Sequence, residues 1–331
     1  MTLIPNTTTP AALRAPLIGA AVLGALAVLN GVAARLAERR HPPQGRFVEV
    51  DGVRLHYTDR GTGKPVVLIH GNVVSAQDWD TSGVAPLLLD SGHRVIAFDR
   101  PGFGHSDRPR GRLWTAAAQA DLLHRALPQI GIERPVVVGH SWGAIVALAL
   151  AARHQADTAG VVLLSGYYFW TLRPDVLPVT LGALPVVGDI LRYTVSPLLG
   201  RLLMPLVKRG MFSPLPVPAR FRKDYSDAMA LRPSQIRATS DDGALMIPGA
   251  VQLQGELDGL RLPTVILAGA ADKVVFSDMA ERLHAALPSS VLHIVQGAGH
   301  MVHYAVPRQV AGIVAAVART GTVPGVTAKA A

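Results

Sequence analysis

Residues 136–143, Val-Val-Val-Gly-His-Ser-Trp-Gly, decide the fold of this chain. Three β-branched residues favour a strand, and an apolar, alanine-rich stretch at 144–150 favours a helix directly behind it. The Gly-x-Ser-x-Gly pattern between them predicts a sharp turn that lifts the Ser141 hydroxyl clear of the sheet. Gly139 and Gly143 remove Cβ atoms where such a backbone passes close to its neighbours. The alternative is an ordinary Gly/Ser turn, and the rest of the chain decides between the two.

Similar short apolar runs recur along the chain and alternate with helical patterns. Residues 47–57 alternate apolar and polar side chains around Asp51-Gly52, which predicts an antiparallel hairpin. Further strands are predicted at 66–70, 94–98, 136–139, 161–165, 265–268 and 291–295, and helices at 84–90, 115–127, 142–153, 278–287 and 305–319. This alternation favours an α/β fold, a mostly parallel eight-stranded sheet with helices on both faces and the hairpin at one edge.

Residues 169–250 interrupt this alternation. They are rich in proline, contain apolar segments such as 181–187 and 198–207, and show no β-α-β rhythm. We interpret them as a helical cap inserted over the sheet between two strands. The apolar segments indicate either an apolar, acyl-chain substrate or a packed cap core. A second membrane span is the alternative for this region, and its charged residues and prolines disfavour it.

An uncharged, mostly apolar run occupies residues 16–34. At ~1.5 Å per residue it just spans the hydrocarbon core of a bilayer. Arg35, Arg39 and Arg40 follow it, and the positive-inside rule then places the following domain in the cytoplasm. We predict a single-pass membrane anchor. A cleaved signal peptide, with a secreted or periplasmic domain, and a buried helix of a soluble protein are the alternatives.

Composition bounds the possible functions. The 331 residues suffice for one large α/β domain with an insertion. The absence of cysteine excludes disulfides, thiol catalysis and cysteine metal sites. The formal net charge is +9, but no aromatic-basic interleaving or nucleic-acid module accompanies it. We therefore predict no nucleic-acid partner, and attribute the charge to a surface that faces anionic lipid.

These observations divide the chain into segments. The predicted division is a disordered N-terminus at 1–15, a transmembrane helix at 16–34, a linker at 35–45, a catalytic core at 46–168 and 251–319, a helical cap at 169–250, and a tail at 320–331.

The candidate catalytic residues follow strand ends. A serine hydroxyl needs a base within hydrogen-bond reach, and the base needs a third group that orients it. In a doubly wound sheet such groups lie at the carboxyl ends of strands. His300 follows the last predicted strand, and Asp272 follows the strand at 265–268. We predict Ser141 as the nucleophile, His300 as the base and Asp272 as the acid.

Other titratable residues are weaker candidates. His303 is the second candidate base, although it lies at the start of a predicted helix. For Asp272 the alternative role is a surface ion pair with Lys273. The remaining candidates lack the strand-end position, namely His124 and His284 in predicted helices, and Asp241, Asp242 and Asp258 in or near the cap.

The oxyanion of an acyl-transfer reaction needs two hydrogen-bond donors. The backbone amide of Trp142, directly after the nucleophile, is one predicted donor. The loop at 68–72 follows an earlier strand, and there Gly71 allows close approach and the Asn72 amide is the second predicted donor. His70 is predicted to hold this loop rather than to act as a base.

Five blocks carry a family resemblance. They are His70-Gly71-Asn72, residues 99–106 (Asp-Arg-Pro-Gly-Phe-Gly-His-Ser), 139–143, 269–272 and 297–300. With the chain order Ser141, Asp272, His300 they resemble the α/β-hydrolase fold superfamily, in its serine esterase and lipase-like branch, across residues 46–319. The resemblance implies a cap between the sixth and seventh strands, a tight loop at 99–106 that shapes the floor of the site, and neither cofactor nor metal.

The serine also discriminates within this superfamily. Haloalkane dehalogenases and epoxide hydrolases carry aspartate at the position of Ser141, and Val73 stands where their His-Gly-x-Pro loop has proline. The predicted function is therefore hydrolysis of an apolar carboxylic ester by a membrane-anchored serine hydrolase. A carbon–carbon bond hydrolase, a lactonase or a cofactor-free perhydrolase of the same fold is the second interpretation, and a non-catalytic membrane scaffold the third.

Overall fold

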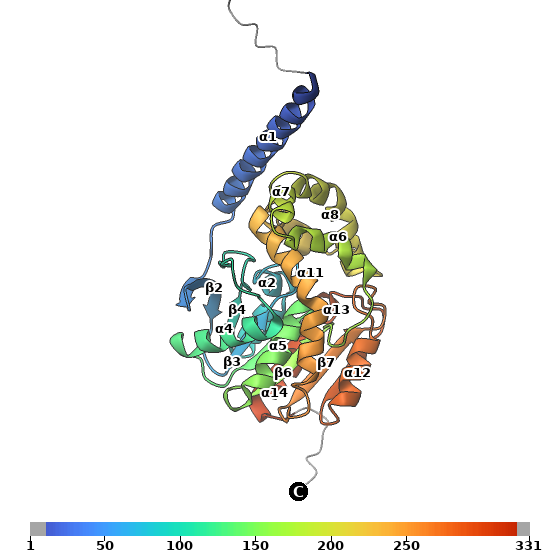
Figure 1. Ribbon diagram of the computed structural model, residues 1–331. Helices are drawn as coiled ribbons and strands as arrows, with labels where there is room; N and C mark the ends of the chain where they lie inside the picture. Colours follow the sequence, from blue (N-terminus) through green and yellow to red (C-terminus); the bar gives the residue numbers. More distant parts are fainter. Residues whose placement is uncertain (1–10, 323–331) are drawn as a thin grey trace, which may run out of the picture.

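An eight-stranded sheet forms the centre of the computed structural model, which describes residues 11–322 (Figure 1). The strand order is β1-β2-β4-β3-β5-β6-β7-β8. Strand β2 is antiparallel to both of its neighbours, and all the remaining neighbouring strands are parallel to each other. This confirms the predicted fold, including the hairpin at one edge. The strands are β1 (Arg46–Val50), β2 (Val53–Arg60), β3 (Pro65–Ile69), β4 (Arg94–Phe98), β5 (Val136–His140), β6 (Gly160–Leu164), β7 (Thr264–Gly269) and β8 (Val291–Val295).

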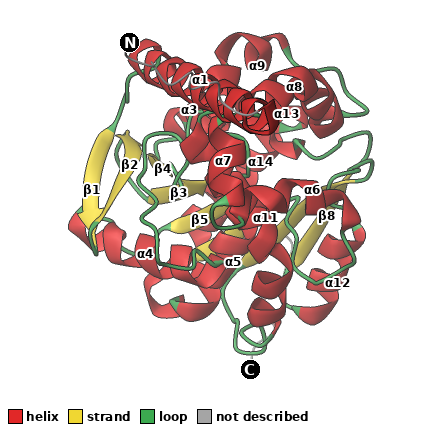
Figure 2. Ribbon diagram, turned by 45° about the horizontal axis from the view of Figure 1, so that its top comes forward, coloured by secondary structure: helices red, strands yellow, loops and turns green. Residues whose placement is uncertain are grey.

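Helices cover both faces of the sheet (Figure 2), and an apolar layer fills the space on each side. Within β3, Val67 and Ile69 enter one layer while Val66 and Leu68 enter the other, as the two-residue period of a strand requires. The first layer is closed by α4 (Ala116–Gln129), α5 (Trp142–Arg153) and α12 (Asp278–Ala286), and the second by α2 (Asp78–Ser82), α3 (Val84–Asp90), α13 (Val302–Ala305) and α14 (Pro307–Thr320).

Two helix predictions differ from the structure. The helix expected at 305–319 is α14, which starts two residues later because Pro307, which lacks a backbone N–H, is its first residue; the short α13 precedes it. The second difference is the short helix α2, which was not predicted because its five residues show no helical periodicity.

The segment between β6 and β7 is helical and lies above the sheet in Figure 1. Its longest helix, α11, runs four residues past the expected end of the cap at 250 and contacts α4 and α5 of the core. Its α-helices are α6 (Leu177–Thr180), α7 (Val187–Tyr193), α8 (Ser196–Phe212), α9 (Ala219–Asp224), α10 (Asp227–Ala230) and α11 (Pro233–Gln254).

The N-terminal helix α1 (Ala11–Arg40) is longer than expected. The prediction of disorder is wrong for residues 11–15, and that of a linker is wrong for 35–40, because alanine, leucine, arginine and glutamate favour helix at both ends. Residues 1–10 and 323–331, where a disordered terminus and a tail were predicted, lie outside the described residues. The part from Ala15 to Arg40 is long and apolar enough to cross a membrane, and only 6% of its most apolar window is buried.

Helix α1 docks on the cap (Figures 1 and 2). It contacts α7, α10 and α11. The buried side-chain amide of Asn30 donates hydrogen bonds of 2.9 Å to the backbone carbonyls of Tyr193 and Thr194, where α7 ends. These carbonyls have no partner within the helix, so Asn30 acts as their cap.

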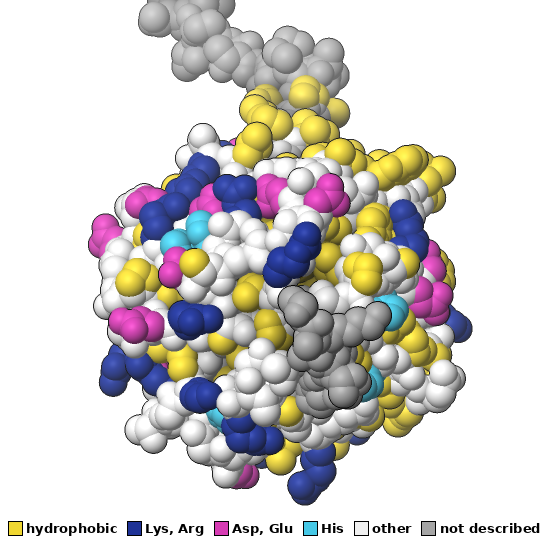
Figure 3. All heavy atoms as spheres, turned by 90° about the horizontal axis from the view of Figure 1, so that it is seen from below, with side chains coloured by type: hydrophobic (Ala, Val, Ile, Leu, Met, Phe, Trp, Pro, Cys, Tyr) yellow, Lys and Arg dark blue, Asp and Glu magenta, His cyan; other side chains and the backbone are white. Residues whose placement is uncertain are grey.

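Helix α8 leaves one apolar face uncovered. Its exposed apolar side chains recur every three to four positions, at Leu198, Leu199, Leu202, Leu203, Leu206 and Val207. Figure 3 views the molecule from below, from the end that lies opposite the cap. This end carries charges of both signs, and apolar side chains gather only towards the top of the picture.

Candidate active site

The Gly-x-Ser-x-Gly stretch forms a strained turn between β5 and α5. Ser141 has φ 55° and ψ −120°, a conformation that non-glycine residues rarely adopt. A Cβ on Gly139 would lie 2.2 Å from the carbonyl oxygen of Gly143, and one on Gly143 would lie 2.2 Å from that of Ile69. Both contacts are to backbone that cannot move aside, so both positions require glycine.

Ser141, His300 and Asp272 form one hydrogen-bonded chain. The distance from Ser141 Oγ to His300 Nε2 is 2.9 Å, and that from His300 Nδ1 to Asp272 Oδ2 is also 2.9 Å. The carboxylate accepts, so Nδ1 carries the imidazole proton and Nε2 is free to accept the serine proton. Each residue follows a different strand of the sheet, respectively β5, β8 and β7.

Backbone contacts hold this chain of residues in place. Asp272 Oδ1 accepts hydrogen bonds from the amides of Val274 (2.8 Å) and Val275 (2.9 Å), which leaves Oδ2 for the histidine. The carbonyl of His300 lies 3.0 Å from His140 Nε2. His300 is thus held both by its ring, through Asp272, and by its backbone carbonyl, through His140.

Arg100, directly after β4, anchors the loop at 70–72. Its buried guanidinium donates to the carbonyls of His70 (2.8 Å) and Gly71 (3.2 Å) and to Asn72 Oδ1 (2.7 Å). In a trans peptide the C=O and the next N–H point in opposite directions. Holding the Gly71 carbonyl therefore turns the Asn72 N–H away from Arg100. On the other side of this loop, a Cβ on Gly71 would lie 3.1 Å from Ser141 Cβ.

Two backbone amides beside Ser141 are unused. Within residues 11–322, neither the Asn72 N–H nor the Trp142 N–H donates a hydrogen bond to a protein atom. Trp142 is the first residue of α5, where amides have no partner within the helix.

The same guanidinium links the loop to the cap. Arg100 Nη1 lies 2.6 Å from Asp242 Oδ2 on α11, and both side chains are fully buried. Asp242 Oδ1 in turn accepts a hydrogen bond of 3.1 Å from Arg108. Asp242 does not follow a strand end and no motif gives Arg100 a role of its own, so the sequence does not predict this link.

His70 has the structural role that was expected. Its Nε2 accepts the Arg100 backbone amide at 2.9 Å, so its proton is on Nδ1, 2.6 Å from the Gly71 carbonyl. Burial, and after it the charge of Arg100, lower the pKa of His70 to about 4 against the attraction of Asp99. The ring is therefore neutral at pH 7 and acts as an acceptor that fixes the loop.

This pKa predicts a loss of stability in acid. The unfolded chain binds a proton at His70 below its ordinary pKa near 6.5, whereas the folded protein resists doing so down to about pH 4. Stability should thus fall as the pH is lowered through this window, by about 2 kcal/mol at pH 5 from His70 alone. Urea unfolding at pH 7 and pH 5 measures the loss. His70→Gln keeps an acceptor without titrating and should lose less, and an equal loss in both proteins would contradict the assignment.

The other histidine candidates lie elsewhere. His303, the second candidate base, is buried with Nε2 2.8 Å from Asp78 Oδ2, and the Tyr304 hydroxyl donates to Asp78 Oδ1 at 2.7 Å. His124 Nε2 lies 2.9 Å from Asp157 at the surface, and His284 Nδ1 lies 2.8 Å from Ser290 Oγ.

One group of side chains has the spacing of metal ligands. In the described part of the chain, atoms of Asp78, His140 and His303 lie within 4.8 Å of one another. All three residues are buried, and the Asp78 carboxylate is already engaged by His303 and Tyr304. We interpret these three residues as a polar cluster in the core, linked through His140 to the backbone carbonyl of His300.

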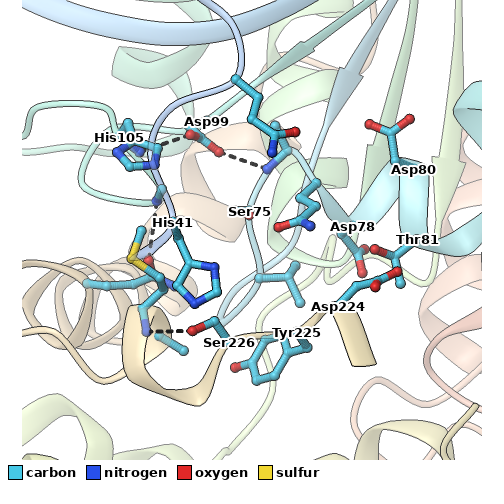
Figure 4. A pocket seen from close by; sticks show the side chains of 18 of the residues that line it. His41, Ser75, Asp78, Asp80, Thr81, Asp99, His105, Asp224, Tyr225 and Ser226 are labelled. Carbon is cyan, nitrogen blue, oxygen red and sulfur yellow. Dashed lines mark hydrogen bonds between the residues drawn. The ribbon is translucent and has the colours of Figure 1, made fainter. Parts of the chain in front are cut away.

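A cavity of about 190 Å³ is lined by the segment after α1, the loops after β3 and β4, and the cap (Figure 4). Asp99 and His105, from the loop after β4, lie on one side of it, Tyr225 and Ser226 of the cap lie on the other, and His41, after α1, lies between them. Neither Ser141 nor His300 lines it. Asp99 accepts the amides of Ala76 (2.8 Å) and His105 (2.9 Å), so the loop at 99–106 is tied to the segment after β3.

Comparisons with known proteins agree with this architecture. A family model described as "alpha/beta hydrolase fold" matches residues 64–305. The chain is 28% identical to haloalkane dehalogenase 2 of Mycobacterium tuberculosis over 286 residues, 83% of this chain and 94% of that enzyme. It is 28% identical to 2-hydroxymuconate semialdehyde hydrolase of Pseudomonas putida over 275 residues, 80% of this chain and 90% of the relative. A solved variant of a meta-cleavage product hydrolase is 25% identical, with a TM-score of 0.60 over 82% of this chain and 97% of the other.

Proposed function

Because the chain belongs to the alpha/beta hydrolase fold family, we propose that it is a serine hydrolase that cleaves carboxylic esters through an acyl-enzyme. The observation that carries this proposal is the hydrogen-bonded chain from Ser141 through His300 to Asp272. A serine hydroxyl becomes a nucleophile when a base accepts its proton as it attacks. We assign the core at 46–168 and 251–319 to this chemistry and the cap at 169–250 to substrate binding.

The proposed reaction has two halves. His300 Nε2 removes the proton of Ser141 as Oγ attacks the ester carbonyl, and then gives that proton to the departing alkoxide. In the second half His300 takes a proton from water as the water attacks the acyl-enzyme, and then gives that proton to Ser141 Oγ as the bond to the acyl group breaks and the acid is released. Asp272 stabilises the imidazolium that forms in both halves.

The amides of Asn72 and Trp142 are the proposed oxyanion donors. Both belong to backbone beside Ser141, and neither has a protein acceptor within residues 11–322. Arg100 fixes the orientation of the Asn72 amide through the Gly71 carbonyl. Donors held before the reaction cost no reorganisation when the charge develops.

Cleavage of a carbon–carbon bond beside a ketone is the second candidate reaction. It is favoured by the likeness to 2-hydroxymuconate semialdehyde hydrolase, an enzyme so named. Ser141 disfavours the dehalogenase reaction of the other relative, since haloalkane dehalogenases carry aspartate at that position. Lactone hydrolysis and perhydrolysis use the same residues.

A substrate panel separates these reactions. We expect the purified full chain to hydrolyse p-nitrophenyl esters, with kcat/KM rising from acetate to longer acyl chains. A 2-hydroxy-6-oxo-dienoate is the matched carbon–carbon substrate. Turnover of that ketone with no turnover of any ester would overturn the ester proposal. A folded protein whose Ser141 resists a fluorophosphonate probe would instead support a non-catalytic scaffold.

We also propose that α1 anchors the enzyme in a membrane, with the catalytic core in the cytoplasm. Arg35, Arg39 and Arg40 follow its apolar run and favour that side. The exposed apolar face of α8 lies on the cap to which α1 is docked. A signal sequence has the same composition near an N-terminus, so the processed form has to be measured.

The exposed face of α8 gives a prediction about depth in the bilayer. The natural chain has no cysteine, so Leu202→Cys and Leu23→Cys each accept a single fluorescent label. In proteoliposomes, lipids with a nitroxide deep in the acyl chain should quench the label at position 23 most strongly. Lipids with a nitroxide near the bilayer surface should quench the label at position 202 most strongly. A label at Glu133→Cys, exposed near the amino end of β5, is the control and should stay bright. If position 202 stays as bright as position 133, then α8 does not touch the bilayer.

A further inference from the structure

A second cavity, of about 480 Å³, lies where α1, the cap and the loop after β4 meet. Neither Ser141 nor His300 lines it. Its charged lining consists of six arginines and two carboxylates, with His105 beside them: Arg54, Arg108, Arg110, Arg192, Arg232 and Arg237, against Glu38 and Asp107.

Three of these arginines are built into the protein. The side chains of Arg108, Arg192 and Arg232 are at most 5% exposed. Burying like charges together is costly unless carboxylates or a ligand compensate them. Some compensation comes from pairs of Arg54 with Asp107, Arg108 with Asp241 and Asp242, Arg110 and Arg192 with Asp189, Arg232 with Glu38, and Arg237 with Asp241.

This compensation is incomplete. Arg108 Nη2 and Arg192 Nε are buried, and within the described residues they have no hydrogen-bond partner. Burial lowers the pKa of Arg237, and the nearby charges of Arg192, Arg110 and Arg108 lower it further despite the attraction of Asp241. The six lining arginines also share only five carboxylates, and one of these, Asp242, is paired with Arg100 as well. An anion in the cavity compensates the positive charge that is left.

We propose that this cavity binds a phosphate group, at a site distinct from the ester site at Ser141. Guanidinium groups match the oxygens of a phosphate in pairs, and several of them line one concave space here. In this site the phosphate oxygens accept hydrogen bonds from guanidinium N–H groups of the lining arginines that the five carboxylates do not engage.

The position of the cavity along α1 favours a phospholipid headgroup as the source of the phosphate. Glu38, on its rim, is four residues beyond Ala34, where the apolar run ends. Four helical residues rise about 6 Å. The headgroup layer extends roughly 5–7 Å beyond the hydrocarbon core on each side. This step rests on the proposed membrane anchor, whereas phosphate binding itself does not.

Calorimetric titration of the detergent-solubilised full chain tests the proposal. The ligands are inorganic phosphate, the dihexyl-ether analogue of phosphatidylglycerol, which has no ester to cleave, and dihexylglycerol, which lacks the phosphate. Before titration, the enzyme is labelled with a fluorophosphonate to block Ser141. The variants Arg237→Gln and Arg110→Gln each remove one lining charge, and Arg125→Gln removes an exposed arginine paired with Asp51 outside the cavity.

We expect the ether lipid to bind to the labelled enzyme, and dihexylglycerol not to bind. Each cavity variant should weaken binding by about fivefold or more, while Arg125→Gln stays within twofold, because one charge-assisted contact is worth about 1 kcal/mol or more. Tighter binding of the lipid than of inorganic phosphate assigns the site to a headgroup, and equal binding assigns it to the free anion. No binding of either phosphate, or equal affinity in folded Arg237→Gln, Arg110→Gln and natural protein, overturns the proposal. If the ester assay fails and Ser141 does not react with the probe, the same titration of the unlabelled enzyme still measures phosphate binding, because the ether lipid has no ester to cleave.

Discussion

Ser141→Ala is expected to lower kcat for a p-nitrophenyl ester by about 10⁴- to 10⁶-fold, with little change in the free energy of unfolding. The hydroxyl that would form the acyl-enzyme is lost, while the amides of Asn72 and Trp142 still bind the polarised carbonyl. A residual rate above that of water should therefore persist. Steady-state kinetics with freshly purified protein measure the loss, and chemical denaturation checks that the variant is folded.

The partner of Ser141 provides the control for this prediction. Residues that act as one unit are strongly non-additive. The double variant Ser141→Ala/His300→Ala should therefore be about as slow as the single serine variant, and not slower by the product of the two effects. If Ser141→Ala retains a tenth or more of the natural activity, another nucleophile performs the reaction.

Arg100→Met is expected to damage both stability and catalysis. It leaves the fully buried carboxylate of Asp242 without its closest charge partner, which typically costs about 3–5 kcal/mol of unfolding free energy. It also releases the carbonyls of His70 and Gly71, so the Asn72 amide is no longer held in one orientation. Loss of one oxyanion donor lowers kcat by about 10²- to 10³-fold. Urea unfolding and steady-state kinetics measure the two effects separately.

A paired substitution separates these two roles of Arg100. In Arg100→Met/Asp242→Leu the buried charge pair is replaced by apolar groups, which is often neutral or stabilising. Stability should recover towards that of the natural protein, while kcat stays low because the loop is still unanchored. Recovery of both quantities together would show that Arg100 acts on catalysis only through stability.

Much of the site could be predicted because its chemistry lies next to strand ends. Ser141, Asp272 and His300 each follow an apolar run that is short and clearly bounded, and parallel strands bring their carboxyl ends together. The strands at 94–98 and 291–295 have the predicted bounds for the same reason. Local sequence patterns are sufficient to predict strand bounds and strand-end residues where the fold repeats a strand followed by a helix.

The link between Arg100 and Asp242 could not be predicted in this way. The two residues are 142 positions apart, and Asp242 lies in a cap whose helices follow no periodic rule relative to the sheet. Asn30 did give a signal, as the only strongly polar residue of an otherwise apolar run. Its partners are backbone carbonyls at the end of α7, which no sequence pattern marks.

The docking of α1 on the cap has a consequence for the proposed membrane anchor. Asn30 ties α1 to the end of α7, and α1 also contacts α10 and α11. With α1 in the bilayer, the cap is the part of the enzyme held directly at the membrane. The sheet with Ser141 is then attached to the membrane through the cap, by the contacts of α11 with α4 and α5 and by the buried pair of Arg100 and Asp242.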